Sequence, residues 1–156
     1  MRRGVTVIEL MVVVAIIAIM GLLMAPALGE WLDNYRIRQG TRDIVSALQQ
    51  ARMRAISTRL EYRVVFDLNN ETYRIERGNQ PSGSSVWTQE GDTFSAPKGV
   101  NIVNTDFPNH TIRFNPNGTS SSSSSSDSIY TNNSKGKQYR IRVAPSGGIS
   151  MSEGWS

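Results

Sequence analysis

The N-terminal stretch constrains this chain more than any other part. Basic residues at positions 2 and 3 precede Gly4, and no charge interrupts the apolar run from Leu10 to Ala25. A helix from Val5 to Leu28 would be about 36 Å long, enough to cross a hydrocarbon layer of about 30 Å. A carboxylate, Glu9, lies near the start of this stretch, and at a bilayer centre a carboxylate costs about 2.5–3.5 kcal/mol. Glu9 therefore needs a partner or a task.

Two simple interpretations of this stretch stay open. A secretory signal peptide would use Arg2 and Arg3 as its basic region and Ala25-Pro26-Ala27 as a small-residue cleavage site. A plain transmembrane anchor would need only the apolar run. Neither interpretation uses Glu9. Cleavage of a signal peptide also does not account for the helical pattern that resumes directly after Gly29.

The segment Gly4-Val5-Thr6-Val7-Ile8-Glu9-Leu10 closely resembles the processing signal of type IV pilins and type II secretion pseudopilins. The resemblance implies that a prepilin peptidase cleaves after Gly4 and methylates Val5 as the new N-terminus. It also implies that Glu9 is retained for assembly, where the amino group of a neighbouring subunit would neutralise it in a medium of low dielectric constant. Val5 departs from the usual phenylalanine. Pro26 falls where many pilins carry a helix-kinking proline.

Periodicity predicts a helix followed by strands. Apolar residues recur at helical spacing from Leu28 to about Leu60 and form one narrow stripe: Ile37, Ile44, Leu48, Ala51 and Ala55. From Glu61 the period changes to two, and the segments 62–68 and 72–77 around Asn69-Asn70 predict a hairpin. Further strands are predicted at 86–89, 100–103, 111–114, 139–143 and 149–151. This order predicts an α+β fold, with a long helix packed on an antiparallel β-sheet domain.

The second half of the chain resembles the GspH/FimT family of minor pilins and pseudopilins. The likeness rests on an "AR-x-x-A" segment at Ala51–Ile56, an "I-x-F-x-x-x-G" element at Ile112–Gly118, and a closing strand and turn at Arg140–Gly148. The expected organisation is a leader (1–4), a transmembrane helix half (5–28), an amphipathic helix half (29–60) and a β-rich domain (61–156). The serine run in the loop 119–128 is expected to form a mobile surface loop.

The resemblance implies a structural function. It predicts a minor subunit that helps to initiate or cap a type IV pilus or a type II secretion pseudopilus, and these two systems share signal, fold and machinery. The implied location is a single pass through the bacterial inner membrane with a periplasmic domain, then the filament tip. The implied partners are the prepilin peptidase, other minor pilins or pseudopilins and the inner-membrane assembly platform. The chain has no cysteine, whereas major pilins usually end in a disulfide-closed loop.

Catalytic chemistry finds little support in the sequence. His110 is the only histidine, and it lies in a predicted polar loop. No cysteine, metal-spaced acid cluster or phosphate-binding glycine loop accompanies it. We therefore expect no enzyme activity, no cofactor and no metal.

Arginines of the predicted helix are candidate contacts. Four of them fall within an arc of about 100° beside the apolar stripe: Arg38, Arg42, Arg52 and Arg59. Val45 and Ile56 lie in the same arc, and a wholly solvated face does not need them. We expect this face to contact neighbouring subunits, with a solvated face or a DNA track as alternatives.

DNA uptake is the alternative function, because some FimT-like proteins bind DNA through basic residues near the C-terminus. Here residues 143–156 contain no lysine or arginine. The nearest candidates for phosphate contacts precede them: Lys135, Lys137, Arg140 and Arg142. Strand alternation predicts that Arg140 and Arg142 share an outer face, where plain solvent exposure is equally expected.

Overall fold

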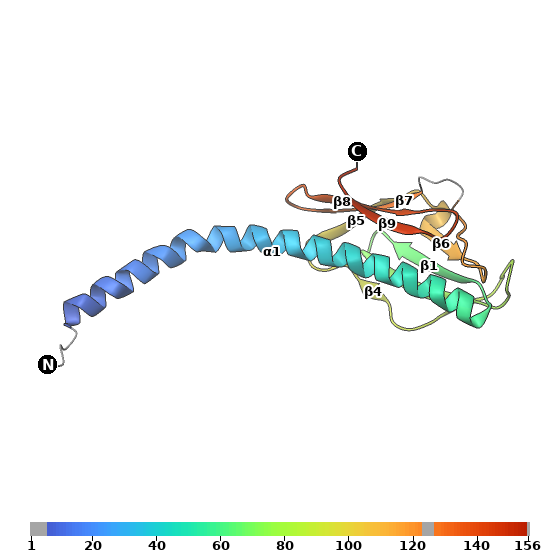
Figure 1. The fold of residues 1–156 in the computed structure, drawn as a ribbon, viewed down its shortest axis with the longest axis horizontal. Helices are drawn as coiled ribbons and strands as arrows, with labels where there is room; N and C mark the ends of the chain where they lie inside the picture. Colours follow the sequence, from blue (N-terminus) through green and yellow to red (C-terminus); the bar gives the residue numbers. More distant parts are fainter. Residues whose placement is uncertain (1–5, 123–126, 156) are drawn as a thin grey trace.

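Helix α1 (Val7–Thr58) dominates the computed structural model, which describes residues 6–122 and 127–155, without the side chains of residues 22–28 and 30. Thr6 caps the helix, because its Oγ1 accepts a hydrogen bond from the backbone N–H of Glu9 at 3.3 Å. The N-terminal half of α1 extends away from the strands, whereas its C-terminal half lies along them (Figure 1). The predicted processing residues, Gly4 and Val5, lie outside the described residues.

The transmembrane half and the kink of α1 stay predictions. Among the described residues, no helix combines the length and the apolar character that crossing a membrane requires. The helix continues through position 26, and Figure 1 shows it curving as it leaves the β domain. The side chain of Pro26 lies outside the described residues.

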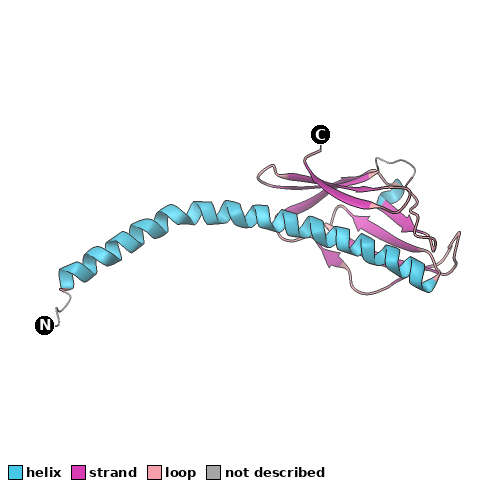
Figure 2. Cartoon of the chain, viewed as in Figure 1, coloured by secondary structure: helices cyan, strands magenta, loops and turns pink. Residues whose placement is uncertain are grey.

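The strands form two antiparallel sheets that pack against the C-terminal half of α1 (Figure 2). The first sheet has the order β3-β2-β1-β6, and β4 also pairs with β2. The second has the order β5-β7-β8-β9. A short 3-10 helix, η1 (Pro108–His110), lies between β5 and β6. The strands are β1 (Tyr62–Asp67), β2 (Thr72–Gly78), β3 (Trp87–Gln89), β4 (Phe94–Ser95), β5 (Val100–Thr105), β6 (Thr111–Phe114), β7 (Ser128–Asn133), β8 (Gln138–Val143) and β9 (Ile149–Glu153).

Apolar side chains from α1 and from both sheets form the core. The helix contributes the predicted stripe, and all of its members are buried: Ile37, Ile44, Leu48, Ala51 and Ala55. Val64 of β1 lies between Ile75 of β2 and Ile112 of β6, and all three are buried. Ile129 and Ile141 face each other across β7 and β8 and complete the core. Burial of each such large side chain contributes about 1.5–3 kcal/mol, so the core fixes the helix on the sheets.

Most of the predicted elements are confirmed. The hairpin predicted over 62–68 and 72–77 is β1–β2, and the other predicted strands correspond to β3, β5, β6, β8 and β9. The α+β fold, with a helix on antiparallel strands, is confirmed as well. Two strands were missed, the short β4 and the central β7, and the strands divide between two sheets rather than forming one.

The serine run departs from the surface loop that we expected. Ser120 and Ser122 are buried, and Ser128 is the first residue of β7. The Oγ of Ser120 donates to the carbonyl oxygen of Ala144 at 2.8 Å, and the Oγ of Ser122 donates to Asp127 Oδ2 at 3.0 Å. A hydroxyl that finds such a partner can be buried. The surface-loop prediction is therefore wrong at these serines, and residues 123–126 lie outside the described residues.

Replacement of Leu48 by alanine tests the core. Leu48 is fully buried between α1 and the sheets, so Leu48→Ala should lower the free energy of unfolding by about 2–5 kcal/mol through lost transfer energy and a residual cavity. Chemical denaturation of the full chain in detergent, followed by circular dichroism, measures this change. The control Met53→Ala, on the same helix but 63% exposed, should change it by less than about 0.5 kcal/mol. Equal effects of the two substitutions would contradict this core assignment.

A buried carboxylate, Glu61, holds the loop before β3 against the start of β1. It accepts hydrogen bonds from the backbone N–H of Ser84 at 2.7 Å and of Gly83 at 3.1 Å, and Arg113 Nε lies 3.6 Å from its Oε1. Burial alone raises the pKa of Glu61, but the bonds from Ser84 and Gly83 and the charge of Arg113 outweigh it, so its pKa lies below the ordinary 4.5. The folded state therefore favours the ionised form of the Glu61 carboxylate.

Acidification should weaken the fold through Glu61. Because its folded-state pKa is lowered, this stabilisation is present above the ordinary value of 4.5 and is lost as the pH falls through the folded-state pKa. Glu61→Gln should have a lower melting temperature at neutral pH and a flatter decline below about pH 4.5 than the parent. Thermal melts across this range measure both. The control Asp92→Asn, at an exposed loop position, should keep the parental slope, and a parental slope for Glu61→Gln would refute the assignment.

Candidate assembly surface

The N-terminal half of α1 presents an uncovered apolar surface. Its large side chains are exposed to between 49% (Val13) and 77% (Val7) in the isolated chain. No strand of the described domain reaches this part of the helix (Figure 1). The exposed members are Val7, Ile8, Leu10–Val14, Ile16, Ile17, Ile19 and Met20. A contiguous apolar surface of this kind marks a contact with a membrane or with other proteins.

Glu9 lies on this surface, in the first turn of α1. Its side chain is exposed, and a negative charge there interacts favourably with the positive end of the helix dipole. The capping bond to Thr6 uses the backbone N–H of Glu9 and does not occupy its carboxylate oxygens. Its expected role in assembly stays a prediction.

The four helix arginines do not share one role. Arg38, Arg42 and Arg59 are exposed. Arg52 is half-buried, and its guanidinium donates from Nε to the carbonyl oxygen of Gly118 at 2.9 Å and from Nη2 to that of Ser146 at 3.3 Å. Arg52 therefore ties α1 to the turn after β6 and to the turn between β8 and β9.

The two aliphatic residues of the arginine arc also separate. Val45 is partly buried against the core, whereas we expected it to face a neighbouring subunit. Ile56 is 48% exposed and remains on the outer face of α1. Helical periodicity alone placed both on one arc, but the two sheets cover a wider part of the helix than the narrow stripe indicates.

The basic residues of the second sheet are spread over a turn and a strand. Lys135 is exposed, and Lys137 Nζ forms an ion pair with Glu153 Oε1 at 2.9 Å. Arg140 and Arg142 alternate with the buried Tyr139 and Ile141, which confirms that the two arginines share the outer face of β8. The ion pair of Lys137 weakens this group as a phosphate-binding patch.

His110 takes part in local structure. Its Nδ1 lies 2.9 Å from the Oγ1 of Thr105, which joins η1 to the end of β5. Within residues 6–122 and 127–155, no group of three or more histidine, cysteine, aspartate and glutamate side chains could hold a metal ion.

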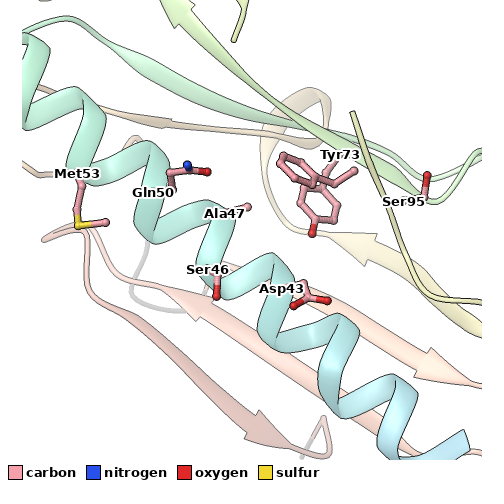
Figure 3. Close-up of a pocket in the computed structure, with 8 residues that line it drawn as sticks. Asp43, Ser46, Ala47, Gln50, Met53, Tyr73 and Ser95 are labelled. Atoms are coloured by element: carbon pink, nitrogen blue, oxygen red, sulfur yellow. The ribbon is translucent and has the colours of Figure 1, made fainter. Parts of the chain in front are cut away.

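A shallow groove of about 520 Å³ separates α1 from the edge of the first sheet (Figure 3). Asp43 and Met53 line its helix side, and Tyr73 and Phe94 line its strand side. The two rings stack with centroids 5.4 Å apart. Burial, reinforced by the nearby Asp43 carboxylate, raises the pKa of Tyr73 to about 12, so its phenol stays protonated. Met53 and Phe94 remain exposed, so this groove also carries apolar side chains that contact solvent.

Sequence reasoning missed an aromatic pair at the junction between the two halves of α1. Trp31 and Tyr35 stack with ring centroids 5.8 Å apart, and both are exposed. The signal was available, because residues four positions apart meet on one helix face.

Comparison with known families identifies the group to which this architecture belongs. The family model described as type II transport protein GspH matches residues 40–147, well over half of the sequence. The chain belongs to the GspH family. Two motifs that suggested this resemblance, Ala51–Ile56 and Ile112–Gly118, lie inside the matched residues.

Individual relatives of this GspH-family chain agree. The type II secretion system protein H of Xanthomonas campestris pv. campestris is 31% identical over 77 residues, which cover 49% of this chain and 46% of that protein. The chain thus matches about half the length of this curated relative. Two structures of the minor pseudopilin EpsH of Vibrio cholerae share the fold, with TM-scores of 0.62 and 0.58 at 10% and 11% identity. They cover 78% and 80% of this chain and 99% of their own. None of these comparisons supports DNA uptake.

Replacement of Arg52 by methionine separates a structural role from a contact role. Arg52→Met keeps the aliphatic stem but removes two charged hydrogen bonds to backbone carbonyls, so the free energy of unfolding should fall by about 1.5–3 kcal/mol. The matched control Arg59→Met, at an exposed position, should change it by less than about 0.5 kcal/mol. Urea denaturation measures both. Parental stability of Arg52→Met would return Arg52 to the candidate contact residues.

Proposed function

We propose that this chain is a minor pseudopilin of a type II secretion system, a structural subunit that helps to initiate or cap the pseudopilus. The observation that carries the proposal is the uncovered apolar half of α1, joined by one continuous helix to a folded domain of the GspH family. The name of the curated relative and the fold shared with EpsH support secretion rather than a type IV pilus.

The uncovered helix half requires an apolar environment at every stage. Exposed apolar area costs about 25 cal/mol per Å² in water. Before assembly the inner membrane supplies that environment, with the chain crossing once and the domain in the periplasm. After assembly the packed helices of neighbouring subunits supply it. Prepilin peptidase cleaves after Gly4, and the methylated Val5 becomes the N-terminus that enters the helix bundle.

Glu9 sets the axial position of the subunit within that bundle. An unpaired carboxylate in a medium of low dielectric constant is costly, whereas a nearby ammonium group compensates it. The N-terminus of a neighbouring pseudopilin is the cation that the same bundle provides. A single polar group in an apolar helix interface fixes register in this way. The partners are therefore other pseudopilins and the inner-membrane assembly platform, and the role requires no catalysis.

Replacement of Glu9 by alanine tests this function. Glu9→Ala should leave cleavage after Gly4 intact, which mass spectrometry of the N-terminus measures. Recovery of the variant with affinity-tagged neighbouring pseudopilins should fall about tenfold or more, because the partner ammonium is left buried and unpaired. The control Glu71→Gln removes a carboxylate from the β domain and should be recovered normally. Normal recovery of Glu9→Ala would refute the proposed function of this residue and weaken the pseudopilin assignment.

A further inference from the structure

A second groove, of about 430 Å³, opens where α1 leaves the β domain. Its helix side carries Trp31, Tyr35 and Arg38, and its sheet side carries Lys137, Tyr139 and Glu153. The groove lies at the opposite end of the domain-bound part of α1 from Arg52 and its hydrogen bonds to Gly118 and Ser146. The groove begins three residues after the predicted end of the transmembrane half at position 28, a rise of about 5 Å along the helix.

Aromatic side chains form the helix wall of this groove. Trp31 is 64% exposed and Tyr35 is 55% exposed, although they stack on each other with an interplanar angle of 18°. Exposed tryptophan and tyrosine rings are costly in water but favourable at the boundary between lipid headgroups and acyl chains, where one end of the ring is apolar and the other is wet. In the proposed transmembrane arrangement, their position just after residue 28 places them at that boundary.

The charged side chains that line the groove in the described part of the chain carry one net positive charge. Lys137 Nζ and Glu153 Oε1 lie 2.9 Å apart, and Tyr139 donates its hydroxyl to Glu153 Oε2 at 3.3 Å. The hydrogen bond from Lys137, and in smaller part the charge of Arg38, hold the pKa of Glu153 below its ordinary value. Arg38 therefore lies near this pair, yet in the described part of the chain it has no ion-pair partner of its own.

We propose that this groove binds the phosphate of an anionic membrane phospholipid with one net negative charge, such as phosphatidylglycerol. The Arg38 guanidinium, a planar fork suited to phosphate oxygens, contacts the phosphate. Trp31 and Tyr35 lie beside the glycerol and the first acyl carbons. The one net positive charge of the lining residues matches one net negative charge, so a zwitterionic headgroup fits less well.

This inference rests on the proposed function, because it takes the membrane to end near residue 28. Its consequence is mechanical. The domain is held against the periplasmic leaflet before assembly, and the helix leaves the domain in a fixed direction. Extraction into the pseudopilus must then break the contact at Arg38 as well as move the apolar helix.

The full chain in lipid vesicles provides the test. The sequence has no cysteine, so the substitution N34C puts a fluorophore on a residue that lines the groove. Phosphatidylglycerol with a nitroxide at the headgroup is titrated into zwitterionic lipid, and the mole fraction that half-quenches the fluorophore is measured. Arg38→Gln should raise that mole fraction about tenfold or more, because the phosphate loses its charge-assisted hydrogen bonds to the guanidinium. Arg38→Lys, which keeps the charge, should raise it less.

Lys98→Gln is the matched control. Lys98 is exposed and follows Pro97, which lies against Gly40 of α1, so it is at a similar level along the helix but does not line the groove. The half-quenching mole fraction should stay parental. Equal shifts for Arg38→Gln and Lys98→Gln would overturn the proposal, since only surface charge would then matter. Equal quenching by a nitroxide-labelled zwitterionic lipid would overturn it too. Loss of the quenching when other pseudopilins are added to the membrane-bound chain, before extraction, would also overturn it.

The outcome separates this inference from the function on which it rests. Resistance of the chain to alkaline extraction from the vesicles reports membrane anchoring, and recovery with neighbouring pseudopilins reports assembly. A chain that passes both tests but shows no effect of Arg38→Gln refutes the lipid site alone. A chain that alkaline treatment extracts refutes both.

Discussion

The packing of one helix half across two sheets is the interaction on which the rest of this structure depends. Leu48 and Ala51 of α1 meet Val64 of β1 and Ile141 of β8 in a single cluster. Small residues on the helix let neighbouring segments approach closely: at Gly40 an added Cβ would lie 2.7 Å from Cδ of Pro97, in the loop between β4 and β5. Because α1 is continuous, fixing its C-terminal half also fixes the direction in which the apolar half leaves the domain.

Polar contacts between α1 and the strands add to the apolar packing. Thr41 Oγ1 on α1 lies 2.9 Å from Thr131 Oγ1 on β7, both buried. At the other end of the domain, Glu90 accepts from Arg54 of α1 at 2.7 Å and from the hydroxyl of Tyr62 of β1 at 2.8 Å. Buried polar groups cost energy unless they are paired. Each pair therefore favours one relative placement of helix and sheets over its alternatives.

Local periodicity made part of this fold predictable. The stripe from Ile37 to Ala55 and the β1–β2 hairpin involve neighbours in sequence, so a period of 3.6 or 2 reveals them. Strand β7 was not predicted from the sequence. Its serine and asparagine positions follow a serine run, and its burial depends on pairing with β5 and β8. The structural role of Arg52 was not predicted either, because it also depends on residues that are distant in the sequence. Its acceptors are backbone carbonyls 66 and 94 residues away, which carry no side-chain signal.

The uncovered helix half has a charge near each end, and this constrains the order of assembly. Glu9 lies in the first turn of α1, and Arg38 lies where the helix meets the domain. In the proposed arrangement these charges lie near the two faces of the membrane, where they cost little, but extraction would draw Glu9 through the bilayer centre, where a carboxylate costs about 2.5–3.5 kcal/mol. A neighbouring N-terminus offsets that cost only if it pairs with Glu9 while the helix is still in lipid. The pseudopilin proposal therefore requires that subunits meet within the membrane, before the proposed lipid contact at Arg38 is broken.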